Sequence, residues 1–146
     1  MELSLALTLP RDQQTVPVAR HIVRNAMAQV GVEEACVYDV ELALSEACTN
    51  VLLHSGPGDQ YIVRLDLEDR RGMIRVIDVG RGFDSVKLQA ENPLLDAEQG
   101  RGLGLMQALV DRVDLSTRPE RGTIVTLEKV LAYADDAEPA GRGKQV

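Results

Sequence analysis

Residues Ser45–His54 read Ser-Glu-Ala-Cys-Thr-Asn-Val-Leu-Leu-His and form the second half of a helix that the sequence predicts over residues 33–54. Apolar residues recur in this segment at intervals of three and four, which is the period of one helix face. The sequence Ser-Gly-Pro-Gly follows at once and ends the helix. The apolar stripe comprises Val37, Val40, Leu44, Ala47 and Val51.

Two polar side chains of this helix, Glu46 and Asn50, are four residues apart. This spacing places them on one face with β-carbons about 6 Å apart. A solvated polar stripe is the ordinary explanation for such a pair. However, their sequence neighbours are mostly apolar, and a carboxylate and a carboxamide one turn apart suit a hydrated Mg²⁺, which takes few protein oxygens beside substrate phosphates. The pair therefore fits either a solvated face or a magnesium site.

The segments on either side of this helix predict strands and two further helices. Residues 2–9 alternate between leucines and smaller or polar side chains, as a half-buried strand does, and Pro10 ends them. Residues 14–30 have a helical period with two adjacent apolar rows, and Gly31 follows as a cap. The rows are Val18, Ile22, Ala26 and Val30, and Ala19, Val23 and Met27. Further strands are expected over residues 61–67, 73–79, 114–117 and 122–130, with a short helix over residues 103–113.

This order of elements predicts an α+β fold. We expect a two-layer α/β sandwich in which helices cover one face of a mixed, mostly antiparallel sheet. One domain is expected over residues 1–132, since 146 residues suffice for a single core. A polar, disordered tail is expected over residues 133–146.

The strand that ends at Asp78 continues into Val-Gly-Arg-Gly-Phe-Asp. An ordinary strand-end turn explains the glycines, because glycine adopts backbone angles forbidden to other residues. The sharper interpretation has the Asp78 carboxylate accept a hydrogen bond from a base amine, while Gly80 and Gly82 admit the chain close to a planar ligand. The polar segment over residues 80–102 is then either a lid or a disordered loop.

A second glycine-rich segment, Gly100-Arg101-Gly102-Leu103-Gly104-Leu105, precedes the predicted helix over residues 103–113. A flexible loop is the simple explanation. Glycine-rich turns at a helix N-terminus also present backbone N–H groups to phosphates. The spacing matches neither the Rossmann nor the Walker pattern. The pair Gly122-Thr123 opens the last strand and by itself indicates only a hairpin.

Composition excludes several classes of function. Sixteen Lys and Arg against 23 Asp and Glu give a formal charge of −7, and the chain has no Trp and one Phe. Such a chain is poorly suited to a phosphate backbone or to stacking on bases. His21 and His54 are far apart, so neither a zinc site nor a serine–histidine triad is supported. We see no signal peptide and no apolar run of about 18 residues, and we expect a soluble, cytoplasmic protein without a membrane segment.

Taken together and in order, four segments resemble the nucleotide-binding boxes of the GHKL ATPase superfamily, which includes gyrase-type ATPases, Hsp90-type chaperones and histidine kinases. Residues 45–54 resemble the helix box, residues 78–82 the adenine box, residues 100–105 the phosphate box, and residues 122–123 the last, adenine-side box. The short chain and the wording Ser-Glu-Ala-Cys-Thr-Asn are most similar to the bacterial anti-sigma-factor serine/threonine kinases. After His54 the chain departs from that family, whose members often have a small residue and a Tyr there.

The resemblance implies a kinase that uses ATP and Mg²⁺. Glu46 would be the catalytic base, and Asn50 would ligate Mg²⁺. Asp78 and Thr123 would contact adenine, and Arg101 would touch phosphate. The implied nucleotide-binding residues are Asn50, Asp78, Gly80, Gly82, Gly100, Arg101, Gly102, Leu103, Gly104, Leu105 and Thr123.

The same resemblance implies the partners. Members of this family are usually homodimers that sequester a sigma factor and phosphorylate an anti-anti-sigma protein on Ser or Thr. No direct contact with nucleic acid is implied. The competing function is a non-catalytic regulatory module that binds ATP and acts only by binding a partner protein.

Overall fold

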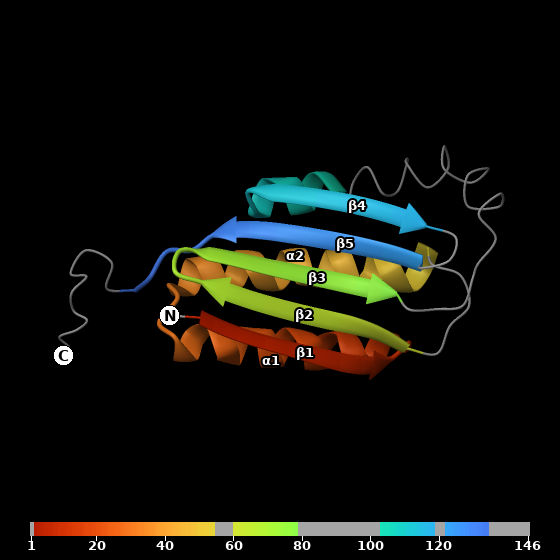
Figure 1. The fold of residues 1–146 in the computed structure, drawn as a ribbon, viewed down its shortest axis with the longest axis horizontal. Helices are drawn as coiled ribbons and strands as arrows, with labels where there is room; N and C mark the ends of the chain where they lie inside the picture. The colour runs from red at the N-terminus through yellow and green to blue at the C-terminus, as the bar shows by residue number, and fades with distance from the viewer. Residues whose placement is uncertain (1, 55–59, 79–102, 119–121, 135–146) are drawn as a thin grey trace.

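The computed structural model describes residues 2–54, 60–78, 103–118 and 122–134. Its strands form one five-stranded antiparallel sheet in the order β1-β2-β3-β5-β4, and the helices lie behind one face of this sheet (Figure 1). A short helix over residues 103–109 lies behind β4. The elements are β1 (Glu2–Pro10), a 3-10 turn η1 (Gln13–Thr15), α1 (Val16–Gln29), α2 (Glu34–His54), β2 (Gln60–Glu68), β3 (Arg71–Asp78), β4 (Arg112–Arg118) and β5 (Gly122–Val130).

The core lies between the sheet and the helices. Buried and less buried residues alternate along β2 and β3, because successive side chains of a strand point to opposite faces. The inward side chains of β2 are at most 3% exposed, and they share one apolar cluster with α2 residues such as Leu44 and Val51. Burial of this face, at roughly 25 cal/mol per Å², supplies the main stabilisation of the fold.

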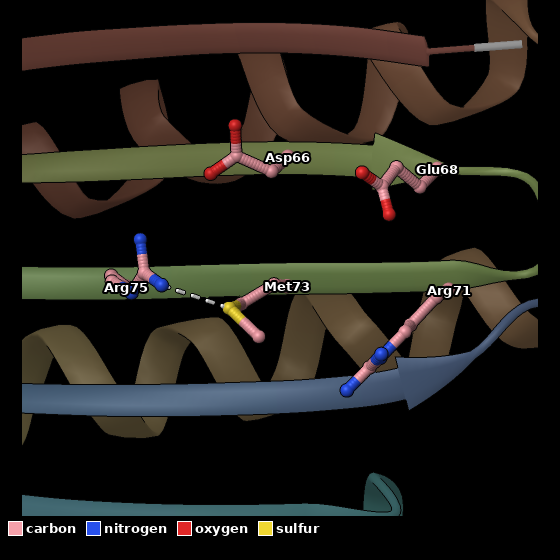
Figure 2. Close-up of a pocket in the computed structure, with 5 residues that line it drawn as sticks. All are labelled: Asp66, Glu68, Arg71, Met73 and Arg75. Atoms are coloured by element: carbon pink, nitrogen blue, oxygen red, sulfur yellow. Dashed lines mark hydrogen bonds between the residues drawn. The ribbon is translucent and has the colours of Figure 1, made fainter.

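The opposite face of the sheet carries polar and charged side chains. Figure 2 shows four of the charged side chains, together with Met73, in front of β2 and β3 on the side away from the helices. Arg75 donates to the sulfur of Met73, and Arg71 pairs with Glu128 of β5. The five residues Asp66, Glu68, Arg71, Met73 and Arg75 line a shallow pocket on this face.

The α+β fold class and the two-layer arrangement expected from the sequence are confirmed. The helix over residues 33–54 ends at His54 as expected. On α1, the expected row Ala19, Val23 and Met27 is buried, whereas Val18 of the other row is 46% exposed.

The prediction of a helix over residues 103–113 was wrong at the C-terminal end of the helix. It stops at residue 109, and β4 begins at Arg112 rather than at residue 114. The cause is pairing with β5: Arg112 lies opposite Glu128, and Lys129 donates to the carbonyl oxygen of Leu109. A local period of side chains does not reveal this long-range pairing.

Two residues of the expected tail belong to the ordered fold. Tyr133 pairs with Val32, and the N–H of Ala134 donates to the carbonyl oxygen of Gly31. Residues 135–146 and the expected lid over residues 80–102 lie outside the described residues. In the described part of the chain, no helix combines the length and apolar character needed to cross a membrane.

Candidate nucleotide site

Three polar or charged side chains are buried in the described part of the chain, and all three are residues that the sequence singled out. They are Asn50 (8% exposed), Asp78 (1%) and Thr123 (4%). Burying a polar group is costly unless it is hydrogen-bonded, and burying a charge costs more. Their burial does not fit a solvated surface.

Asp78 and Thr123 come from the end of β3 and the start of β5, which are neighbouring strands. Gly122, just before Thr123, has a φ of +84°, and a β-carbon there would overlap the carbonyl oxygen of Asp78. Only glycine allows this approach without strain. In the sequence Gly122 by itself indicates only a hairpin, whereas in the structure it brings the backbone of β5 against the end of β3.

Thr123 carries an unusual hydroxyl. Its Oγ1 is buried, and no hydrogen-bond partner for it exists among the described residues. Leaving a buried hydroxyl unsatisfied costs about 1–3 kcal/mol. A ligand that offers a hydrogen-bonding group at this point would remove that cost.

Arg11 contacts the candidate site residue Asp78, and the sequence did not mark it. Its Nε lies 3.8 Å from Oδ1 of Asp78, and its terminal nitrogen donates to the carbonyl oxygen of Leu52 at 3.1 Å. One guanidinium thus joins the end of β3 to the last turn of α2, which carries Asn50 and Leu52. No sequence signal marks Arg11, since it follows a strand-ending proline in a polar segment.

Glu46 and Asn50 lie one turn apart on α2, which packs against β3 and β5. Asn50 is buried, whereas Glu46 is half-buried. Within the described residues, no hydrogen bond or ion pair engages the Glu46 carboxylate. The alternative of a solvated polar stripe does not fit Asn50, which is inside the protein.

The second glycine segment is described only in part. Leu103, Gly104 and Leu105 form the first residues of the helix over residues 103–109. Leu105 is 42% exposed, and the position of a β-carbon on Gly104 meets no described atom within 4 Å. Gly80, Gly82, Gly100, Arg101 and Gly102 lie outside the described residues.

A buried network supports α2 beneath the site. Tyr61 of β2 lies opposite Asp78 in the sheet, and its hydroxyl is 2.7 Å from Oγ1 of Thr15. The Cys48 thiol also interacts with this hydroxyl. Burial raises the pKa of the Cys48 thiol to about 12 and the pKa of Tyr61 to about 12. Both groups are therefore neutral at physiological pH, and Cys48 has a structural role.

This fold and this candidate site define a class of protein: an antiparallel sheet with helices behind one face, and buried polar residues at the end of β3, the start of β5 and on α2. The family described as "Histidine kinase-like ATPase domain" matches residues 9–129. The chain belongs to this family.

Relatives agree with the resemblance predicted from the sequence. The chain is 31% identical over 125 residues to an anti-sigma F factor of Caldanaerobacter subterraneus. The aligned residues make up 81% of this chain and 87% of that protein. It is 27% identical over 137 residues to the serine-protein kinase RsbW of Halalkalibacterium halodurans. That alignment spans 88% of this chain and 83% of the relative.

A solved structure shows the same fold. It contains RsbU and RsbW domains of a Mycobacterium tuberculosis protein and superposes with a TM-score of 0.68 at 23% identity. The match covers 88% of this chain, which spans about a third (32%) of that longer chain.

The buried thiol gives a pH prediction. The pKa of Cys48 is about 12 in the folded protein against an ordinary value of 9.0, so the unfolded chain loses the proton first and rising pH favours unfolding. The free energy of unfolding should fall by about 1 kcal/mol between pH 9 and pH 10 from this group alone. Urea titrations at several pH values measure it, with Tyr61 adding to the decline above pH 10. Cys48→Ala should flatten the decline between pH 9 and pH 10, and an unchanged slope would contradict the assignment.

Proposed function

We propose that this chain is an anti-sigma factor and an ATP-dependent serine/threonine protein kinase. It binds ATP with Mg²⁺, sequesters a sigma factor and phosphorylates an anti-anti-sigma protein, and it works as a homodimer in the cytoplasm. One observation supports the binding of ATP. The buried polar side chains of the described residues, Asn50, Asp78 and Thr123, are the ones that the sequence motifs assign to the nucleotide. The names of the relatives support the partner and kinase parts.

Asp78 and Thr123 suit the adenine base. A carboxylate only accepts hydrogen bonds and has about four lone-pair sites, so it accepts from the exocyclic amine of adenine in addition to its protein contacts. The Thr123 hydroxyl both donates and accepts, so it fits a ring nitrogen or a bridging water. The guanidinium of Arg11, 3.8 Å away, places a positive charge beside the Asp78 carboxylate.

Glu46 and Asn50 suit phosphoryl transfer. Asn50 supplies a carboxamide oxygen of the kind that Mg²⁺ accepts, and the ion neutralises phosphate charge when it is bound. Glu46 orients the attacking hydroxyl of the protein substrate and takes its proton. The hydroxyl oxygen then bonds to the γ-phosphorus, the bond from this phosphorus to the β–γ bridging oxygen breaks, and ADP leaves. Gly80, Gly82, Gly100, Arg101, Gly102, Leu103, Gly104 and Leu105 complete the proposed nucleotide contacts.

The alternative function is a non-catalytic module that binds ATP and acts only through protein binding. Two observations favour the kinase. Glu46 has a carboxylate that no described residue engages, as a proton acceptor requires, and a relative with 83% of its length matched is named a serine-protein kinase.

The adenine assignment predicts a loss of ATP affinity in Asp78→Asn. The change keeps the size of the side chain but replaces a charged acceptor, and a hydrogen bond to a charged group contributes about 1.5–3 kcal/mol. Calorimetric titration should show ATP binding weakened about tenfold or more, since about 1.4 kcal/mol is a factor of ten. Asp114→Asn, at an exposed position of β4, is the matched control and should bind ATP like the wild type. Equal affinities for all three proteins would exclude Asp78 from the adenine site.

The roles proposed for Glu46 and Asn50 predict that Glu46→Gln lowers phosphoryl transfer alone, whereas Asn50→Ala lowers both ATP affinity and phosphoryl transfer. Glu46→Gln removes proton acceptance, which is worth about 10²–10⁴-fold in rate, while ATP affinity should stay nearly unchanged. Asn50→Ala removes a metal ligand, so Mg²⁺-dependent ATP affinity and phosphoryl transfer should fall together. ATP titration and transfer of labelled phosphate to an anti-anti-sigma protein measure the two quantities.

Glu34→Gln is the matched control for this experiment, because Glu34 lies 77% exposed at the other end of α2. It should transfer phosphate at the wild-type rate. If Glu46→Gln also transferred phosphate at that rate, the non-catalytic module would be the better description of this protein.

A further inference from the structure

Arg11 connects two parts of the candidate nucleotide site that come from different elements. It lies between β1 and η1, and its side chain is only 12% exposed. Its Nε lies 3.8 Å from Oδ1 of Asp78 at the end of β3. Its terminal nitrogen donates to the carbonyl oxygen of Leu52 in the last turn of α2 at 3.1 Å. One side chain therefore contacts both the carboxylate proposed to recognise the base and the helix that carries Asn50.

The contact with Leu52 holds the C-terminal end of α2. The helix ends at His54, so the Leu52 carbonyl is one of the last four, which have no partner within the helix. An arginine near a helix C-terminus both donates to these carbonyls and interacts favourably with the helix dipole. Asn50 lies just before Leu52 and is 8% exposed. Because Asn50 belongs to the same end of the helix, the contact that holds Leu52 also holds the proposed Mg²⁺ ligand.

The segment that carries Arg11 is itself fixed to the sheet. The N–H of Asp12 donates to the carbonyl oxygen of Pro10 at 2.8 Å, which closes a tight turn around Arg11. The Thr15 hydroxyl donates to the carbonyl oxygen of Pro10 at 3.2 Å and lies 2.7 Å from the Tyr61 hydroxyl of β2. The backbone of Arg11 is thus held on both sides, so its side chain orients its neighbours from a fixed base.

The chemistry of the guanidinium suits this double contact. Its donors sit on different nitrogens of a rigid plane, so it holds two acceptors in a fixed relation. A lysine has its three donors on one nitrogen and lacks this geometry. A carboxylate has about four lone-pair sites, so the ion pair with Arg11 leaves sites of Asp78 for a base.

We propose that Arg11 is a positioning residue for nucleotide binding. It orients the Asp78 carboxylate so that adenine is distinguished from other bases, and it holds Asn50 in place for Mg²⁺ through the last turn of α2. The inference rests on the proposed function, in which Asp78 contacts the base and Asn50 the metal ion. Base selectivity and the effect of Mg²⁺ on ATP affinity then both depend on Arg11, without contact between Arg11 and the nucleotide.

Calorimetric titration of the full chain tests this through two ratios. The first is the Kd for inosine triphosphate, which has a carbonyl oxygen in place of the exocyclic amine of adenine, divided by the Kd for ATP. The second is the Kd for ATP in EDTA divided by the Kd for ATP in Mg²⁺. Arg11→Met removes the guanidinium and should lower each ratio about threefold or more, since groups in one network are energetically coupled. A purely structural role would weaken all of these Kd values alike and leave both ratios unchanged.

Arg11→Lys separates charge from geometry. It keeps the positive charge but cannot hold Asp78 and Leu52 at the same time, so the Mg²⁺ ratio should again fall about threefold or more. Circular dichroism verifies that each variant is folded, and Arg11→Lys decides the test if Arg11→Met is unfolded. A Mg²⁺ ratio of Arg11→Lys equal to that of the wild type would overturn the inference, because charge alone would then be enough.

Arg24→Met is the matched control. Arg24 also joins two elements, through ion pairs from α1 to Glu34 and Glu41 in the first half of α2. Its loss should leave both ratios as in the wild type. If the wild type prefers ATP and Mg²⁺ and Arg11→Met does so to the same extent, the inference is overturned while the proposed nucleotide site stands. A wild type that does not bind ATP, or that binds ATP and inosine triphosphate equally, overturns the proposed site and the inference with it.

Discussion

The buried carboxylate of Asp78 at the end of β3 is the constraint around which the site is organised. A charge that is 1% exposed requires nearby opposite charge or hydrogen bonds, since its desolvation costs several kcal/mol. Arg11 supplies the opposite charge and also holds the last turn of α2 through the carbonyl oxygen of Leu52. The position of α2, and hence of Glu46 and Asn50, is thereby coupled to the residue that would recognise the base.

The sheet provides the rigid support for this arrangement. Gly122 lets β5 approach the backbone of Asp78, which places the unsatisfied hydroxyl of Thr123 in the neighbouring strand. Tyr61, opposite Asp78 on β2, anchors the site from the other side through Thr15 and Cys48. Groups held on packed strands and a helix keep a more precise geometry than groups on loops, which suits a phosphoryl transfer that depends on positioning.

Much of the fold follows from local periods in the sequence. The alternation in β1 and β2 and the apolar stripe of α2 predict these elements because each expresses the burial of one face. The helix end near residue 109 and the contact of Arg11 with Asp78 were not predictable in this way, because both depend on pairing between distant segments. The order of the four motifs singles out Asn50, Asp78 and Thr123 as candidates, and the structure shows that they are buried, whereas Gly122 needed the structure to show which backbone it passes. The glycines over residues 80–102 remain predictions.

The central claim is that Asp78 accepts a hydrogen bond from the exocyclic amine of adenine. Replacing ATP by inosine triphosphate tests it on the unmodified protein, because inosine presents a carbonyl oxygen at that position. Two acceptors would then face each other in a buried site, which costs the hydrogen bond and adds repulsion. Calorimetric titration with Mg²⁺ should give a Kd for inosine triphosphate at least about tenfold larger than that for ATP. Equal dissociation constants for the two nucleotides would contradict the account.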